Sequence, residues 1–471
     1  MNPDQKGVLQ GVILAKRPGP RTWICVENTF IFIGLFILLF SDGKLIQTPG
    51  YAGYILRGIT AALRVSEVQW ALFVCYMVYF SLFLWKQLYL AECSWARLIP
   101  YFYLAGGLFL SLVVSLYHQS LAVGAVKFLM CIVSGQIVLF AGHPIVRDEV
   151  TPVMKSSFRI PVFLLILLIV AAGWRTHDDF PSMYRQDVRL SGPWDNPNTF
   201  GLMMGVGMIL ATAIFVHLWR FGVSNINRCI LTIACGAAIG VTGYGLMLSY
   251  SRGAWLGTGF AWFGLVACSC KGTGWSGLQQ IRKCGYISAI IIAIGILVSG
   301  ELDHSSRPTL VKRIMSMGNT NDFSWRNRVE GWKGLLMIAS ERPWFGAGWD
   351  KPLQLYESYY LPSKVDEPAA IETNDCLILA ASLGVPAFCC FGMSICLFLA
   401  REAPSTNRAK FGKRAGMNIK QGAQMVAGNH MAAACSWGAT ILLVGFWFDG
   451  GVFKLASGST FWILLLLAKS W

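Results

Sequence analysis

Residues 198–219 read NTFGLMMGVGMILATAIFVHLW, and residues 229–250 read CILTIACGAAIGVTGYGLMLSY. Neither stretch contains Asp, Glu, Lys or Arg. Each has roughly the 20 apolar residues that an α-helix needs to cross the hydrocarbon core of a bilayer. The connection between them, residues 220–228, is short and carries two arginines. The pair therefore predicts two consecutive transmembrane helices.

The same pattern recurs along most of the 471 residues, of which 55% are hydrophobic and only 13% are charged. We predict an all-α polytopic membrane protein with about 12 transmembrane helices, forming a single integral membrane domain over residues 1–471. The predicted spans are 22–40, 68–90, 98–117, 121–142, 159–174, 198–219, 229–250, 253–270, 284–300, 376–400, 431–448 and 452–469.

The net charge of +15 fits a membrane protein better than a nucleic-acid-binding one. Basic residues beside membrane spans orient the chain and attract anionic lipid, which we expect as a partner. The basic residues do not form a recognisable nucleic-acid-binding module, so we expect no nucleic acid partner. Most of the 14 cysteines lie inside apolar runs and none forms a CxxC pair, which is typical of small core residues.

The distribution of Lys and Arg predicts that both termini lie in the cytoplasm. With that orientation the cytoplasmic segments carry 21 basic residues, and the short outside segments carry 8. The long segment 301–375 is left out of this comparison because the positive-inside rule applies to short loops. It lies outside, between the ninth and tenth spans.

Loops as long as the outside segment 301–375 are usually either functional or disordered in compact domains. The tryptophans of this loop argue against disorder, so we expect it to be partly helical and functional. Trp325–Ser340 predicts a helix, with Asp322 or Ser324 as its cap and the Pro343–Gly348 turn as its end. At 100° per residue, one apolar side carries Arg328 together with Trp325, Val329, Trp332, Leu336 and Ala339. Arg328 is then a snorkelling residue, a structural ion pair or part of an anion site.

Two more arginines share the predicted outside face. Arg189 comes before the sixth span, and Arg252 lies in the hairpin between the seventh and eighth spans. Guanidinium groups stay charged and offer paired hydrogen bonds that match phosphate oxygens. Three converging arginines would suit a pyrophosphate. Taken singly, Arg189 could instead be an interfacial anchor and Arg252 could cap a tight turn.

The polar motifs of these segments follow a definite order: Arg189 with Asn196-Pro197-Asn198, Ser251-Arg252-Gly253, Arg328-x-x-x-Trp332, Pro343-Trp-Phe-Gly346-Ala-Gly348, and Asn374-Asp375 with a later Gly384. In order, spacing and membrane side they resemble the bacterial O-antigen ligase and O-antigen polymerase superfamily. The resemblance covers residues 185–390, which we interpret as an O-antigen ligase-like core region.

The resemblance implies glycan transfer or polymerisation at the periplasmic face of the bacterial inner membrane, and makes 301–375 a periplasmic loop. The donor would be a glycan linked to undecaprenyl diphosphate, and the acceptor a glycan or a lipid. We expect no cofactor and a metal-independent enzyme, because the histidines and paired aspartates lack metal-ligand spacing. The candidate catalytic residues are Arg189, Arg252, Arg328, Glu372 and Asp375, and the candidate substrate-binding residues are Asn196, Asn198, Ser251, Trp332, Thr373 and Asn374.

One position departs from the ligase pattern. Family ligases typically carry a histidine, the expected base, directly before the asparagine that opens the tenth span, whereas this chain has Thr373. A threonine hydroxyl cannot act as a base at neutral pH. Glu372, Asp375 or His304 could substitute, or the reaction could proceed without a dedicated base, as is tolerable in polymerases that rely on arginines.

Two other functions fit a multi-span protein. A transporter or flippase of lipid-linked sugar or an anionic solute would also place arginines inside the membrane, but it is expected to show repeated halves, which this sequence lacks. A membrane scaffold would not require polar motifs at three separate span ends.

Overall fold

The computed structural model describes residues 95–118, 128, 129, 131, 132, 135, 159–179, 189–194, 196–220, 225–270, 323–349, 351–360, 374–400 and 419–470. Every regular element within these ranges is helical, which confirms the predicted all-α class for this part of the chain. The predicted spans 22–40, 68–90 and 284–300 lie outside the described residues, and 121–142 is described only at a few helical positions. The total of twelve spans stays a prediction.

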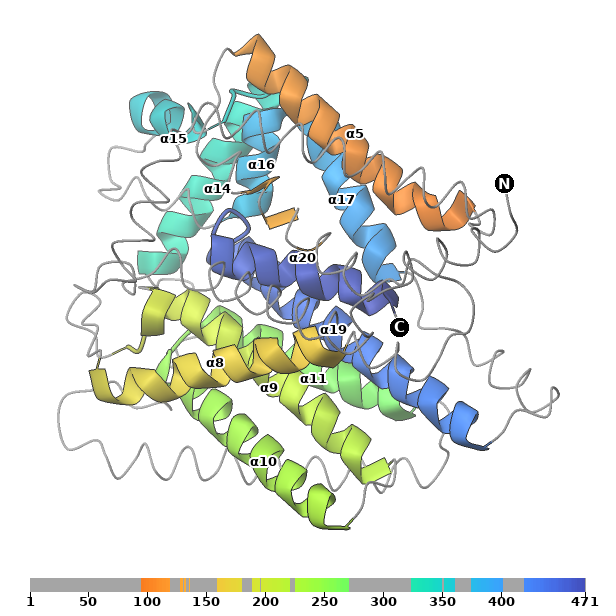
Figure 1. The fold of residues 1–471 in the computed structure, drawn as a ribbon. Coiled ribbons are helices and arrows are strands. Elements are labelled where there is room, and N and C mark those ends of the chain that lie inside the picture. The colour runs from red at the N-terminus through yellow and green to blue at the C-terminus, as the bar shows by residue number, and fades with distance from the viewer. Residues whose placement is uncertain are drawn as a thin grey trace, which may run out of the picture.

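The long helices follow the predicted spans closely (Figure 1). Those long and apolar enough to cross a membrane, among the described residues, include Ile99–Tyr117, Pro197–Val216, Cys229–Leu248 and Met431–Phe448. Shorter apolar helical segments cover Leu165–Trp174, Val385–Ala400 and Leu455–Ala468. The helices are α5 (Trp95–Tyr117), α8 (Arg159–Asp179), α9 (Pro197–Arg220), α10 (Asn225–Leu248), α11 (Arg252–Cys270), α14 (Phe323–Glu341), α15 (Lys351–Leu355), α16 (Asp375–Leu383), α17 (Val385–Ala400), α19 (Ile419–Phe448) and α20 (Leu455–Ser470), with the single turns η2 (Gly192–Trp194) and η4 (Tyr356–Tyr360).

Helix α9 lies at the centre of the main bundle, packed by α8, α10, α11, α19 and α20. Its apolar side chains are almost all buried, including Phe200, Leu202, Met203 and Ile209, because helices cover it on several sides. Figure 1 shows α5 and α17 running side by side on one side of α20, with α8 to α11 on the other. Helices α14 and α16 pack together at the end of this assembly.

The predicted single span 376–400 is wrong, because two helices, α16 and α17, replace it. The break lies at Gly384, whose φ of 83° suits glycine. In an unbroken helix the carbonyl of Ser382 would meet Pro386, which has no N–H to donate. That carbonyl accepts a hydrogen bond from Gly348 N at 2.9 Å instead.

The Pro343–Gly348 turn closes the gap in the broken helix. Ala347 N donates to Ala381 O at 2.8 Å, and Val385 N donates to Pro343 O at 2.8 Å. The backbones touch so closely that a Cβ at Gly346 would lie 2.4 Å from the Ser382 carbonyl. The two glycine-containing motifs of the sequence are therefore halves of one backbone clamp, which holds α16 against the end of α14.

The loop helix is confirmed as α14, with two corrections. Ser324 lies inside the helix and does not precede it, while Asp322 lies outside the described residues. The apolar side is also displaced from its predicted position, because Leu336 is 55% exposed whereas Leu335 and Ile338 are buried. The helix packs through the side that carries Gly334, where a Cβ would lie 2.4 Å from the Tyr356 ring, so glycine sets the line of closest approach.

Candidate functional site

A buried carboxylate marks the end of the helix bundle where the predicted outside segments meet. Asp449 follows directly after α19, in a turn that Gly450 and Gly451 make with φ of 68° and 139°. Its side chain is 3% exposed. Oδ1 of Asp449 accepts hydrogen bonds from Arg328 Nη2 at 2.6 Å and from Asn198 Nδ2 at 3.0 Å. The carboxylate therefore joins α9, α14 and α19.

Arg189 is tied to the same carboxylate through Asn198. Arg189 Nη2 donates to Asn198 Oδ1 at 2.7 Å, and Arg189 Nε donates to Ser249 O at 3.0 Å. The backbone beside it is held too, since Leu190 N donates to Leu248 O at 3.1 Å. Two of the three predicted arginines thus belong to one chain of contacts, Arg189–Asn198–Asp449–Arg328.

Local sequence explains why Asn198 reaches this position. Asn196 caps α9, its Oδ1 accepting from Asn198 N at 2.8 Å and from Thr199 N at 3.4 Å. Pro197 follows at the first helical position, where the lack of an N–H costs nothing. The cap sets the first turn of α9 and directs Asn198 toward Asp449.

The Ser251-Arg252-Gly253 motif lies against the same carboxylate. Ser251 is buried and caps α11, its Oγ accepting from Ala254 N at 3.3 Å. Arg252 is the first residue of the helix and is half-buried. A Cβ at Gly253 would lie 2.8 Å from Asp449 Oδ2, so glycine allows this close approach.

The start of α16 joins the site from the other side. Asn374 caps the helix through Oδ1, which accepts from Leu377 N at 3.0 Å, while its buried Nδ2 has no partner among the described residues. Asp375 Oδ2 accepts from Val452 N at 2.5 Å, which fixes α16 to the turn after Asp449. Glu372 and Thr373 lie outside the described residues.

Trp332 of α14 packs on the last turn of α19, which ends directly before Asp449 in the sequence. Its ring lies 6.2 Å from the ring of Trp447 and 6.2 Å from that of Phe448, and 5.7 Å from the ring of Trp325. The described candidate residues therefore gather at one end of the bundle: Arg189, Asn196, Asn198, Ser251, Arg252, Arg328, Trp332, Asn374 and Asp375. Which side of the membrane this end faces stays a prediction.

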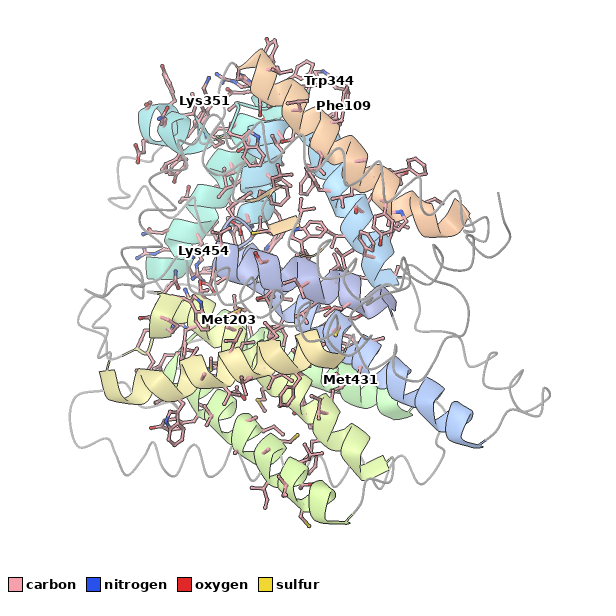
Figure 2. All side chains as sticks on the ribbon, in the orientation of Figure 1. Phe109, Met203, Trp344, Lys351, Met431 and Lys454 are labelled. Carbon is pink, nitrogen blue, oxygen red and sulfur yellow. The ribbon has the colours of Figure 1, made fainter. Side chains whose placement is uncertain are left out.

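The electrostatics of this end favour an anion. Burial raises the pKa of Asp449 above its usual value, although Arg328, Arg189 and Lys454 oppose that rise. Lys454 Nζ donates to Thr199 Oγ1 at 3.4 Å, and Figure 2 shows Lys454 at the beginning of α20. The N-terminal ends of α9, α11, α16 and α20 meet here, each adding partial positive charge. Such an arrangement suits a phosphate group.

Asp449 and Lys454 are not among the site residues predicted from the sequence. A signal was available, because these are the only charged residues between 431 and 468. Charged residues within membrane-spanning stretches often mark functional sites. Their position next to a predicted turn made them resemble ordinary loop residues.

Metal-ligand clusters are absent from the described part of the chain, where no three His, Cys, Asp or Glu side chains are placed to hold an ion. Among the cysteines whose side chains the structure describes, those at positions 131, 229, 235, 376, 389, 390, 396 and 435 are free thiols. The predicted metal independence is not tested by this observation.

Part of the chain matches a known protein family. The family model described as O-antigen ligase matches residues 237–392. No curated protein matches the chain. The match contains Arg252, Arg328 and Asp375, while Arg189 and Asp449 lie outside it in sequence and meet it in space. Together with the helices long and apolar enough to cross a membrane, it supports a multi-pass membrane protein. The chain thus matches the O-antigen ligase family over residues 237–392.

Proposed function

We propose that this protein transfers or polymerises a glycan carried on undecaprenyl diphosphate, at the periplasmic face of the bacterial inner membrane. The observation that carries the proposal is the contact chain Arg189–Asn198–Asp449–Arg328, which lies beside Arg252. It lies at the ends of several spans, where the diphosphate of a membrane-anchored lipid would also lie. The family match supports glycan transfer as the reaction class.

The proposed reaction depends mainly on cations that stabilise the leaving group. When the acceptor hydroxyl attacks the anomeric carbon, the bond to the diphosphate oxygen breaks and negative charge grows on the leaving group. Arginines placed beforehand at that position stabilise the transition state without reorganising during the reaction. Arg189 is held at Nε by the Ser249 carbonyl and at Nη2 by Asn198, so its direction is set before substrate arrives.

The proposed roles follow the geometry. Arg189, Arg252 and Arg328 would bind the diphosphate, with Asn198 orienting Arg189. Asn196 and Ser251 use their side-chain oxygens as helix caps, so they support the site mainly by positioning it. The buried Nδ2 of Asn374 is a donor available for a substrate oxygen.

Further substrate contacts are proposed for Trp332 and Thr373. A tryptophan ring beside the cations can pack on the apolar face of a sugar. Glu372 and Asp375 remain candidate acids or bases by sequence, although the Asp375 carboxylate already holds the Val452 backbone. The acceptor is a glycan if chains are extended, or a lipid anchor if they are transferred.

The test is reconstitution of the purified protein with labelled undecaprenyl-diphosphate oligosaccharide and an acceptor. A ladder of products would identify a polymerase, and a single transfer a ligase. We expect Arg189→Ala, Arg252→Ala and Arg328→Ala to lower the rate by about 100-fold or more, as loss of one charge-stabilising donor does elsewhere. Arg326→Ala is the matched control, since Arg326 is exposed on the same helix as Arg328.

Full activity in all three folded arginine variants would overturn the proposal. A labelled glycan that crosses the vesicle membrane without changing its length or attachment would do so as well, because that result describes a transporter or flippase.

A further inference from the structure

The site contains an acidic side chain that the sequence motifs do not assign. Resting on the function proposed above, we propose that Asp449 is the catalytic base, with Oδ2 accepting the proton of the attacking hydroxyl. It would fill the role that Thr373 cannot perform.

The geometry separates the two oxygens of this carboxylate. Oδ1 receives the hydrogen bonds from Arg328 and Asn198, which hold the group in one orientation. Oδ2 points toward Gly253, where a side chain carbon would come within 2.8 Å. A carboxylate held through one oxygen can present the lone pairs of the other to a substrate.

The location of Asp449 also fits a base. It shares its contacts with the arginines that would hold the diphosphate, so it lies next to the leaving group and hence near the reacting anomeric carbon. Asp375 has a structural role, because its Oδ2 accepts from Val452 N and anchors α16 to the turn after Asp449. Glu372 and His304, the other candidate bases, lie outside the described residues.

The surroundings of Asp449 make it more basic than an exposed aspartate. The charged groups around it come from four elements: Arg328 on α14, Arg189 before η2, Lys454 before α20 and Arg252 at the start of α11. The first three lower its pKa, yet burial prevails and raises it. A bound diphosphate would neutralise these cations and raise the pKa further.

The proposed glycan transfer is a simple displacement at the anomeric carbon. The acceptor oxygen forms a bond to the anomeric carbon, and the bond from that carbon to the diphosphate oxygen breaks. The electron pair of the broken bond stays on the diphosphate. The hydroxyl proton passes to Asp449 Oδ2 and then to the released diphosphate or to water, which regenerates the carboxylate.

The test compares Asp449→Asn with the wild-type protein, measuring kcat and donor KM across pH. The amide is isosteric and keeps an oxygen for Arg328 and Asn198, but it cannot take the proton. We expect kcat to fall by about 100-fold or more. Donor KM should stay constant or fall, because a negative charge near the diphosphate is removed. The decline of kcat at acid pH should disappear from the variant.

The opposite pattern of kcat and donor KM would show that Asp449 is only a counter-ion of the arginines. If Asp449→Asn raises donor KM while kcat and its pH profile are retained, Asp449 only holds the arginines and the inference is overturned. Glu330→Gln is the matched control: Glu330 pairs with Lys333 on the exposed side of α14. It should leave both constants unchanged.

Two further outcomes are separable. If Asp449→Asn does not fold, Asp449→Glu replaces it, and the acid limb of kcat must shift in that variant; an unshifted limb overturns the assignment. A wild-type protein that binds no undecaprenyl-diphosphate donor, measured by direct binding, overturns the proposed function and this inference with it.

Discussion

Gly253→Ala should damage catalysis more than stability. The new methyl group would lie 2.8 Å from Asp449 Oδ2, whereas ordinary contacts begin at 3.4 Å. The carboxylate must therefore move by about 0.6 Å, the difference between these two distances. A movement of that size along the Asn198 bond stretches it from 3.0 Å to about 3.6 Å, beyond hydrogen-bond range. Losing one hydrogen bond to a charged group costs about 1.5–3 kcal/mol.

The expected loss of glycan transfer is about 10- to 100-fold, if this cost falls on the transition state. The melting temperature should fall only modestly, because alanine is favoured over glycine in a helix by up to about 1 kcal/mol, which offsets part of the lost hydrogen bond. The assay is the transfer rate in proteoliposomes, with the melting curve measured on the same preparation. Gly259→Ala is the control, since a Cβ at this α11 position meets nothing within 4 Å. Equal activity in the Gly253→Ala and Gly259→Ala proteins would show that the close contact between Gly253 and Asp449 does not matter for transfer.

Gly384→Ala should destabilise the protein by about 2–4 kcal/mol, since it combines a left-handed backbone with a Cβ 2.5 Å from the Trp344 carbonyl oxygen. Thermal unfolding in detergent measures this change, and an unaffected midpoint would rule out the clamp. Gly392→Ala on α17, where a Cβ meets nothing within 4 Å, is its control and should unfold like the wild type. Asn374→Ala removes the cap of α16 and should cost about 1 kcal/mol, seen as faster amide exchange in that helix; unchanged exchange would show that the cap does not matter. Wild-type kcat should fall as the pH drops through the pKa of Asp449, which burial raises, because a base must be unprotonated; a profile that is flat down to the range of an exposed aspartate would contradict this.

Much of the helix layout could be predicted from local features. Runs such as 198–219 and 229–250 are long, apolar and uncharged, and few structures other than membrane-spanning helices accommodate them. The caps at Asn196, Ser251 and Asn374 are local as well, because each side chain reaches a backbone N–H only a few residues ahead. Such contacts depend on sequence spacing alone.

Periodicity was less successful in showing which side of a helix packs. For α14 it predicted the side with Leu336, whereas Leu335 and Ile338 are the buried residues. Neighbouring helical positions differ by only 100°, and hydrophobicity cannot tell a side that meets protein from a side left exposed. The approach of Tyr356 to Gly334 decides the matter, and that contact depends on a different segment of the chain.

Sequence alone was enough to predict the membrane class, most of the described long helices and the polar motifs at their ends, because length, hydropathy and capping act within one segment. The separation of α16 from α17, the clamp made by the Pro343–Gly348 turn and the contacts of Asp449 with Arg328 and Asn198 are visible only in the folded protein. These contacts connect residues 121 and 251 positions apart. Their energy arises when desolvated charges and backbone groups meet partners from distant segments, and no pattern within a single segment specifies those partners.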